Sequence, residues 1–297
     1  MNFPIRTIQP GDYPGLLRHC DDLPDKMYVR GMLPPNDQIF LTVVGTRKNT
    51  NYGKEVCREL ISALRGLPVV IVSGLAYGID SIAHETALEY GLKTIAVPGS
   101  GLADEEIYPA AHVDLAHRIL KAGGALLSPF EETVMGNKWT FPKRNRIMAG
   151  MAKATLVIES TVKSGTLITA KHATEFNRDV FAVPGGIFSS VSAGPHFLIR
   201  LGATPITGGE DLIDALGFEL SAVEEGALDS ILSELSDEER RVVAILDHPM
   251  PREELVEKLG MSVAEASALI SLLELKGIIE ESLGEIRLDG KYRESLQ

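Results

Sequence analysis

The hydrophobic positions between residues 39 and 218 follow one repeated pattern: a short apolar run, a turn that contains glycine, and a stretch with helical periodicity. The apolar runs are continuous and rich in β-branched residues, which is typical of strands buried on both faces of a sheet. We expect seven such strands, in the segments IFLTVVG, PVVIVSG, KTIAVPG, ALLS, ATLVIES, VFAVPG and ATPIT. Strands that alternate with helices favour a mostly parallel sheet covered on both sides, so the pattern predicts a doubly wound α/β domain over residues 35–218.

The pattern changes at both ends of the chain. Its start is too rich in proline for long helices, and we expect an irregular, partly helical lead-in segment over residues 1–34. Residues 219–228 are expected to form a linker. Residues 229–297 then show three helical patterns, with Ser236 and Ser262 as N-caps, followed by two short strand-like stretches. This order predicts a small winged helix-turn-helix domain.

Composition narrows the class of protein. The 44% of hydrophobic and 24% of charged residues are those of an ordinary globular protein. The formal net charge of −12 argues against a general attraction to nucleic acid or to anionic membranes, but a local basic groove is compatible with it. Cys20 and Cys57 have neither disulfide-framework nor metal-ligand spacing. Because no signal sequence is evident and no apolar run reaches roughly 18 residues, we expect a cytoplasmic protein with reduced thiols.

Small residues follow nearly every predicted strand. In an open parallel sheet, ligands bind outside the carboxyl ends of the strands, where glycines let backbone N–H groups approach an anion. We therefore expect a phosphate-binding rim, although each glycine is also explained by turn geometry alone. Neither a complete GxGxxG motif nor a P-loop is present, so no nucleotide cofactor is expected. The ends of the first, second and fifth strands bring to this rim Gly45, Arg47, Ser73, Gly74, Ser164 and Gly165.

A basic and aromatic stretch lies within residues 137–172. No carboxylate occurs between Glu132 and Glu159, whereas five basic residues do. We expect a helix that begins near Pro142 and keeps its basic residues near the N-terminus or on the exposed side. Cations beside aromatic faces suit single-stranded nucleic acid, because the bases stack and the phosphates are neutralised. The alternative, that the aromatic residues are core anchors, stays open. The candidate contacts here are Phe141, Lys143, Arg144, Asn145 and Arg146, with Trp139 a weaker one.

No catalytic constellation is evident in the sequence. Asp80 and His84 lie four residues apart at a predicted helix start and would share one face. We favour a helix cap for Asp80 and a packed side chain for His84 over acid–base chemistry. Ser73 follows a strand but lies outside a GxSxG elbow, and no HExxH motif occurs. We therefore expect a protein that is not an enzyme.

Several motifs together resemble the DNA-processing protein A family (DprA, also called Smf). They are VVGTR, IVSGLAYGIDSIAH, TIAVPGSGLADEEIYP, FPKRNRIMAG, LVIES followed by SGTLITAKHA, and FAVPGG, within residues 10–217. The resemblance implies a Rossmann-like sheet in a non-catalytic protein that binds single-stranded DNA, protects incoming strands in natural transformation and helps to load RecA. It also implies a homodimer formed through the Rossmann-like domain. The DNA contacts it implies are Arg47, Ser73, Gly74, Phe141, Lys143, Arg144, Ser164 and Gly165.

The chain departs from the family pattern at a few positions. Pro129 stands in LLSP where the family has LLSE, and His112 and His196 stand where asparagine is usual. Only a short segment precedes DYPGLL, where many members carry a helical domain. These departures concern details of the rim and leave the expected fold and DNA-binding class unchanged.

Two other functions are compatible with parts of the pattern. The related phosphoribohydrolase family that activates cytokinins shares glycine-rich rims and a PGG turn, which would make this chain a nucleotide-cleaving enzyme. That family carries a glutamate in a PGGxGTxxE pattern, whereas residues 184–186 are followed here by IFSSVSAG. Alternatively, the winged helix could regulate transcription while the large domain senses a nucleotide.

The predicted winged-helix domain is acidic. Residues 228–297 hold 16 Asp or Glu and eight Lys or Arg, a net charge of −8. Its third helix carries Glu265 and Glu274 against the single cation Lys276, and its wing offers Arg287 among acidic neighbours. DNA phosphates would be repelled by such a surface. We therefore expect this domain to contact protein and not to read duplex DNA.

Overall fold

The computed structural model describes the whole chain except residues 1–2, 15, 219–234, 247, 283 and 289–297. The chain divides into two compact units, Met1–Phe218 and Glu219–Gln297. The expected linker, residues 219–228, lies outside the described residues. Among the described residues, no helix combines the length and the apolar character that crossing a membrane requires.

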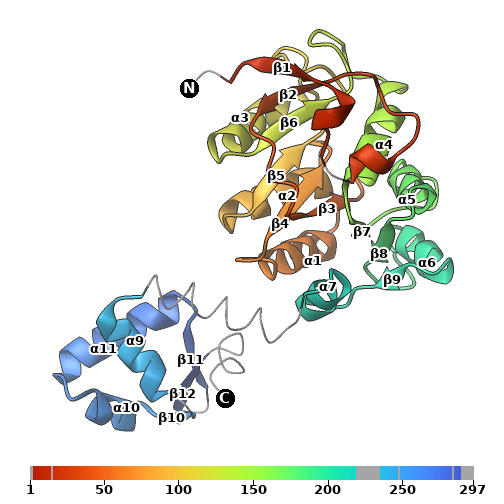
Figure 1. Cartoon of the computed structure of the whole chain (residues 1–297). Helices are drawn as coiled ribbons and strands as arrows, with labels where there is room; N and C mark the ends of the chain where they lie inside the picture. Colours follow the sequence, from red (N-terminus) through yellow and green to blue (C-terminus); the bar gives the residue numbers. More distant parts are fainter. Residues whose placement is uncertain (1–2, 15, 219–234, 247, 283, 289–297) are drawn as a thin grey trace. The chain divides into compact units, whose positions relative to one another are not determined.

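The first unit is built on a nine-stranded sheet, counted over the described residues, in the order β1-β2-β6-β5-β4-β3-β7-β8-β9 (Figure 1). All seven strands that the hydrophobic pattern predicts are present, and they run parallel to one another. Their order reverses between β3 and β7, which makes the fold a Rossmann-like, doubly wound sheet. The bounds are β3 Ile39–Val44, β4 Val69–Ser73, β5 Lys93–Ala96, β6 Ala125–Ser128, β7 Ala154–Val157, β8 Asp179–Ala182 and β9 Thr204–Pro205.

Helices cover both faces of this sheet (Figure 1). Neighbouring side chains on one strand point to opposite faces, so Leu126 packs with the α3 cluster while Leu127 joins the core under α4. One layer is formed by α1 (Asn51–Ser62), α2 (Ile79–Glu89) and α3 (Val113–Lys121), with α7 (Gly209–Ala215) against α1. The other layer is formed by α4 (Thr140–Met151), α5 (Thr166–Glu175) and α6 (Ala193–Arg200).

The N-terminal segment corrects the expectation of an irregular lead-in. Two of its stretches are strands, β1 (Ile5–Ile8) and β2 (Met27–Gly31), and β2 extends the sheet by pairing antiparallel with β6. The prolines do not break these strands, because they lie before β1, in the connection between β1 and β2, or after β2. That connection holds two short 3-10 turns, and its Tyr13 and Leu17 are buried in the core shared with α4.

The second unit is a small winged helix. Its described helices are α9 (Asp237–Ile245), α10 (Arg252–Leu259) and α11 (Val263–Leu275), and a three-stranded sheet follows the order β10-β12-β11. Both predicted capping boxes are formed, at Ser236 and at Ser262. A separate apolar core joins the helices to the sheet. The strands are β10 (Met250–Pro251), β11 (Ile279–Ser282) and β12 (Glu285–Leu288).

Candidate nucleic-acid interface

A cleft of ≈330 Å³ opens where the strand order reverses, at the carboxyl ends of β3 and β7. The connections that leave these two strands belong to opposite helix layers, so they diverge and leave space for a ligand between them. Thr166 joins the two sides, because its hydroxyl donates a 3.1 Å hydrogen bond to the carbonyl oxygen of Gly45. The cleft is lined by Val44, Gly45, Thr46, Arg47, Ala76, Asp80, Phe141, Arg144, Asn145, Met148, Thr161, Ser164, Gly165, Thr166 and Thr169.

Arg47 is the exposed cation of the cleft. The turn after β4 approaches it so closely that a Cβ on Gly78 would lie 2.3 Å from the carbonyl oxygen of Thr46, and Gly78 has a φ of +77° that favours glycine. The guanidinium of Arg47 lies over the ring of Phe141, with 5.1 Å between its Cζ atom and the ring centroid. Within the described part of the chain, Arg47 forms no ion pair, so its charge remains available to an anion.

Phe141 occupies the position between the cleft and the neighbouring turns. Its ring centroid lies 6.0 Å from that of Tyr108, and the ring fills the space beside Gly99, where a Cβ would be 2.4 Å from the Phe141 Cδ1 atom. The side chain is half-buried. Phe141 therefore packs against the neighbouring turns and also lines the cleft. The two roles that the sequence leaves open, packing anchor and ligand contact, are both compatible with this position.

Arg144, which the sequence predicts to contact DNA, lines the cleft from a buried position. Its side chain is buried at the base of the cleft with 4% of its surface exposed, and its Nη1 atom donates a 2.6 Å hydrogen bond to the carbonyl oxygen of Val97. The helix begins at Thr140, two residues before the predicted Pro142. This register turns Arg144 toward the sheet together with Met148. Burial lowers the pKa of Arg144 to about 10, which still leaves the group protonated at neutral pH.

Asp80 and His84 serve the structure beneath the rim. Asp80 is buried, and its Oδ2 atom accepts hydrogen bonds from the backbone N–H groups of Gly74 and Ala76, so it holds the β4 turn and does not cap its own helix. Burial raises the pKa of Asp80, and nearby Arg144 opposes this shift. His84 is fully buried, and burial lowers its pKa to about 3, so the packed interpretation is confirmed.

The remaining predicted contacts either line the cleft or lie in the buried structure beneath it. Ser73 is fully buried, and its hydroxyl donates a 2.7 Å hydrogen bond to the carbonyl oxygen of Val43. Asn145 is also buried, and its amide faces the carbonyl oxygen of Gly165 at 3.4 Å. Lys143 is exposed and forms no ion pair among the described residues. Of the predicted set, the residues that line the cleft are Gly45, Arg47, Phe141, Arg144, Asn145, Ser164 and Gly165.

Arg146 lies away from the cleft, which corrects its expected place in the basic groove. Its guanidinium stacks over the ring of Phe176 at 4.5 Å and donates a 3.0 Å hydrogen bond to the carbonyl oxygen of Asp21. It also lies 3.8 Å from the carboxylate of Glu175. Two residues along a helix are about 200° apart, so Arg144 and Arg146 cannot face the same side. Arg146 therefore fastens the N-terminal segment onto the α4 and α5 layer.

Glu159 is a functional support that the sequence reasoning missed. It lies two residues after the end of β7 and is 2% exposed, and its carboxylate accepts hydrogen bonds from the backbone N–H and the hydroxyl of Thr50, at 2.9 and 2.6 Å. Thr50 caps the start of α1, so the negative charge lies at the positive end of that helix. Glu159 thereby fixes the loop that carries Arg47. The one available signal was its position as the first carboxylate after a long acid-free stretch.

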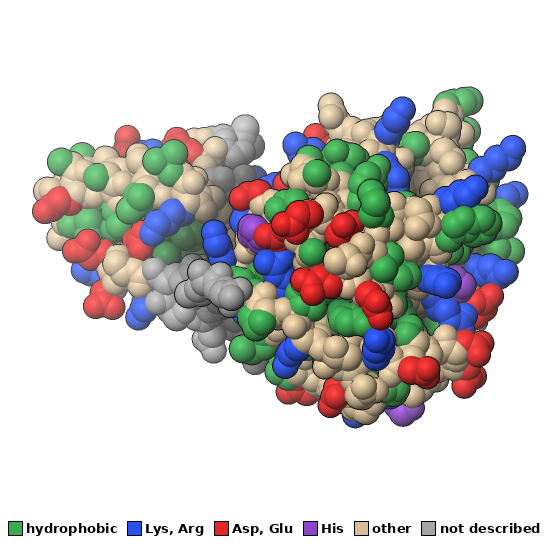
Figure 2. Space-filling model, turned by 90° about the horizontal axis from the view of Figure 1, so that it is seen from above, with side chains coloured by type: hydrophobic (Ala, Val, Ile, Leu, Met, Phe, Trp, Pro, Cys, Tyr) green, Lys and Arg blue, Asp and Glu red, His purple; other side chains and the backbone are tan. Residues whose placement is uncertain are grey.

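The surface charge around the interface is local. Figure 2 shows basic, acidic and hydrophobic side chains intermingled on the face of the large unit that it presents, without one extended basic field. The exposed lysines near the cleft are Lys48, Lys143 and Lys163, and none of them forms an ion pair in the described ranges. Attraction of a polyanion therefore depends on a few cations at the rim.

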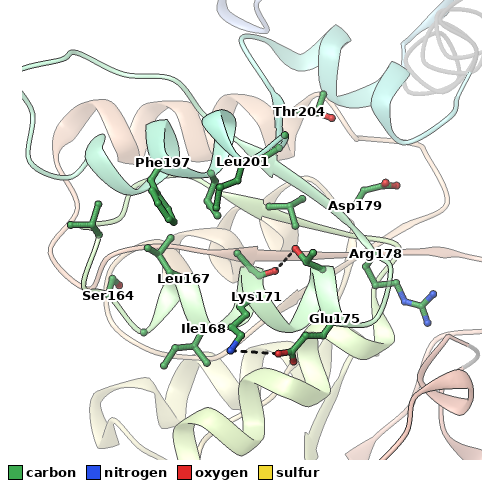
Figure 3. Close-up of a pocket in the computed structure, with 18 of the residues that line it drawn as sticks. Ser164, Leu167, Ile168, Lys171, Glu175, Arg178, Asp179, Phe197, Leu201 and Thr204 are labelled. Carbon is green, nitrogen blue, oxygen red and sulfur yellow. Dashed lines mark hydrogen bonds and ion pairs between the residues drawn. The ribbon is translucent and has the colours of Figure 1, made fainter.

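A second, larger hollow lies on the outer layer of the same unit. It has a volume of ≈960 Å³ and runs between α5 and α6, with Ile168, Phe197 and Leu201 among the exposed apolar side chains that line it (Figure 3). Lys171 and Glu175 form an i,i+4 ion pair on its α5 side (Figure 3). We call this hollow the α5–α6 groove. Its apolar lining differs from the polar cleft and is unsuited to phosphate.

Comparison with known proteins identifies close relatives over both units. The family model described as DNA recombination-mediator protein A matches residues 4–217, and the DprA winged helix domain matches residues 227–285. Protein Smf of Escherichia coli K12 is 37% identical over 284 residues, which are 93% of this chain and 75% of that protein.

Two solved structures resemble the large unit. DNA processing protein A from Streptococcus pneumoniae shares 38% identity with a TM-score of 0.65, over 73% of this chain and 75% of that one. DNA processing protein A from Helicobacter pylori shares 28% identity with a TM-score of 0.63, over 72% of this chain and 96% of that one. The structure of the Helicobacter protein concerns its single-stranded DNA binding mode.

Two glycines of the predicted set should respond differently to alanine. In Gly74→Ala the new Cβ would lie 1.6 Å from the Arg144 Nη1 atom, which is hydrogen-bonded and buried and has no room to move. We expect a loss of about 1–3 kcal/mol in the free energy of unfolding, measured by urea titration. Gly165→Ala is the control, because nothing lies within 4 Å of its Cβ and its φ is −59°. Equal stability of the two variants would contradict the close packing at Gly74.

Proposed function

Because the chain belongs to the DNA recombination-mediator protein A family, we propose that it binds single-stranded DNA at the carboxyl edge of its large sheet. The observation that carries this proposal is the exposed guanidinium of Arg47 over the Phe141 ring, at the point where the strand order reverses. A cation held against an aromatic ring suits a ligand with both phosphates and flat bases. The single-stranded DNA binding of the Helicobacter relative supports the same assignment.

The proposed binding is strand-selective and indifferent to base sequence. Sequence reading of duplex DNA needs a helix or a ribbon that reaches base edges in a groove. The rim instead offers turns, short loops and small polar residues such as Ser164 and Thr161 around a cleft of ≈330 Å³. Backbone groups and hydroxyls of this kind bind phosphate and sugar, which every nucleotide shares.

We further propose that the protein acts without catalysis as a recombination mediator in the cytoplasm, protecting strands taken up in natural transformation and helping to load RecA onto them. The family to which the chain belongs supports this role. The candidate acid and base, Asp80 and His84, are both buried and engaged with neighbouring groups. The alternative of a phosphoribohydrolase lacks a glutamate after the Pro184–Gly186 turn, where Ile187 and Phe188 follow.

A homodimer formed through the Rossmann-like unit is part of the proposal. The α5–α6 groove supplies a surface for it, because Phe197 and Leu201 expose 38% and 69% of their area beside a hollow of ≈960 Å³. Apolar side chains gathered around one hollow are typical of surfaces that another protein covers. We assign the groove to a second copy of this chain.

The first prediction concerns salt and strand selectivity. The exposed cations of the rim are Arg47, Lys48, Lys143 and Lys163. If these four neutralise phosphates, log affinity for single strands should fall with log salt at a slope of about −3, because each phosphate contributes roughly −0.7. Arg47→Ala should make the slope shallower by about 0.7, because one phosphate contact is lost. Fluorescence anisotropy with oligothymidylate measures both quantities.

Arg58→Ala is the matched control for Arg47→Ala, because Arg58 is engaged with Glu89 on the outer side of α1. It should leave the salt slope unchanged. Tighter binding to duplex than to single strands, or an unchanged slope in Arg47→Ala, would contradict the assignment.

The second prediction tests the dimer surface. Leu201→Glu places a charge at the α5–α6 groove and should convert a dimer into a monomer, because burying an unpaired carboxylate is unfavourable. Size-exclusion chromatography with light scattering measures the mass. Met32→Glu is the control, since Met32 is 70% exposed and lies outside the groove. A wild-type chain that is monomeric at micromolar concentration, or a dimeric Leu201→Glu variant, would refute the assignment.

The third prediction concerns the winged-helix unit, which we propose contacts protein. The described cation Arg252 already lies near Glu281 and Glu274, at 2.9 and 3.7 Å, and Lys258 pairs with Glu254. A chain that ends after residue 220 should therefore keep its single-strand affinity within tenfold, about 1.4 kcal/mol. A larger loss, or duplex binding that the full chain shows and the shortened chain lacks, would contradict this role.

A further inference from the structure

Exposed aromatic side chains gather at one edge of the large sheet. The described part of the chain has six exposed aromatic residues. Five of them lie in loops that follow the carboxyl ends of strands or in the first turn of the next helix, and the sixth, Phe197, lies in the middle of α6 beside the α5–α6 groove. Apolar rings exposed to water are unfavourable, and their repetition at one edge calls for a common explanation. The five are Tyr52 after β3, Tyr77 after β4, Tyr108 after β5, Trp139 after β6 and Phe188 after β8.

These residues follow the order of the strands in the sheet. Along β6-β5-β4-β3-β7-β8 the aromatic residues occur in the order Trp139, Tyr108, Tyr77, Tyr52 and Phe188, with β7 contributing Ser164 and Gly165 of the cleft. Neighbouring strands lie about 4.8 Å apart, so the five steps from β6 to β8 span roughly 24 Å. At a spacing of about 3.4 Å per phosphate, roughly seven phosphates would fit over that distance, and fewer in a stretched strand.

Direct contacts connect the row to the cleft on one side and link neighbouring members of the row on the other. On one side, Tyr108 lies 6.0 Å from Phe141, whose ring is covered by Arg47. On the other side, the hydroxyl of Tyr52 donates a 2.6 Å hydrogen bond to the carbonyl oxygen of Pro184, in the turn that leads to Phe188. The row therefore adjoins the proposed DNA site at Tyr108, and Tyr52 ties its other part to the turn that leads to Phe188.

The two ends of the row are the most exposed. Phe188 exposes 98% of its surface and Trp139 exposes 72%, so neither ring anchors the core. Lys138 lies over the Trp139 ring, with 5.1 Å between its Nζ atom and the ring centroid. A cation and an aromatic face thus occur together at this end, as Arg47 and Phe141 do in the middle.

We propose that Trp139 and Phe188 are base-stacking residues at the two ends of a single-stranded DNA track that crosses the carboxyl edge of the sheet from β6 to β8. The inference rests on the proposed function and deepens it, because it extends a cleft of ≈330 Å³ to a site several nucleotides long. Stacking on an aromatic face tolerates every base, since each base has a π face. The track therefore lengthens the footprint without adding sequence preference.

The chain carries its own reporter for this track, because Trp139 is its single tryptophan. Titration of the full-length protein with oligothymidylate of about 20 nucleotides should quench the Trp139 emission, with the same midpoint as fluorescence anisotropy of the labelled oligonucleotide. The quench follows from stacking of thymine on the indole. Trp139 emission that stays constant while anisotropy reports saturation would overturn the assignment of Trp139.

The length of the oligonucleotide tests Phe188. Phe188→Ala should weaken binding of a 20-nucleotide strand about five- to 150-fold, the range found when one stacked base is lost. A strand of about four nucleotides, held in the cleft around Arg47, should bind the variant and the wild type equally. Phe188→Trp should keep the long-strand affinity and, in a Trp139→Phe background, should show its own quench.

Two controls separate stacking from other causes. Met32→Ala removes another exposed apolar side chain at the end of β2, which runs antiparallel to β6, and should change nothing. An oligonucleotide that is abasic throughout should bind wild type and Phe188→Ala equally, because no base is present to stack. Equal losses on abasic and normal strands would overturn the stacking role.

The outcomes also distinguish the track from the function on which it rests. A protein that binds no single-stranded DNA by anisotropy would overturn both. A protein that binds it with a salt slope set by Arg47, but with unquenched Trp139 and with Phe188→Ala unchanged on long strands, would overturn the track alone. Stability of each variant is followed by urea unfolding, where no change is expected because both side chains are exposed.

Discussion

The buried guanidinium of Arg144 is the interaction on which the candidate site depends. It joins α4 to the end of β5 through the carbonyl oxygen of Val97, and it lies beside Gly74 in the β4 turn that Asp80 holds. Taking such a charge out of water costs several kcal/mol, and the nearby carboxylate and carbonyl groups offset this cost. Because the helix, the strand end and the turn are fixed together, Phe141 and Arg47 are held in place above them.

Charge placement explains how a protein with a net charge of −12 can present an anion site. At physiological ionic strength the field of an exposed charge is screened over about 8 Å, so distant acids contribute little at the rim. The acid that lines the cleft, Asp80, is buried and accepts hydrogen bonds from the backbone N–H groups of Gly74 and Ala76. Glu159, which fixes the loop that carries Arg47, is directed at the first turn of α1 and accepts hydrogen bonds from Thr50. Among the residues that line the cleft, the exposed charged group is therefore the cation Arg47, beside the half-buried ring of Phe141.

The sequence predicted the parallel strands β3 to β9 well, because strands buried on both faces leave continuous apolar runs. It missed β1 and β2, since both strands are short, neither carries the continuous apolar run of the parallel strands, and prolines flank them. Around the cleft, the prediction located the right stretch but assigned Lys143, Arg144 and Arg146 to one basic site. The helical rotation of about 100° per residue instead exposes the first, buries the second and turns the third toward Phe176. Such a difference needs the helix register and the position of the sheet.

The pairing of charges also bears on the winged-helix unit, whose fold alone would suggest that it binds duplex DNA. Its described cations are largely neutralised from within: Lys276 bonds to the buried Glu239, Lys258 lies 2.9 Å from Glu254, and Arg252 lies between two glutamates. A cation that already has an acidic partner gains less from a phosphate, because the existing pair must first be broken. The basic residues of the rim have no such partners among the described residues. These cations of the winged-helix unit are therefore less available to a phosphate than the basic residues of the rim.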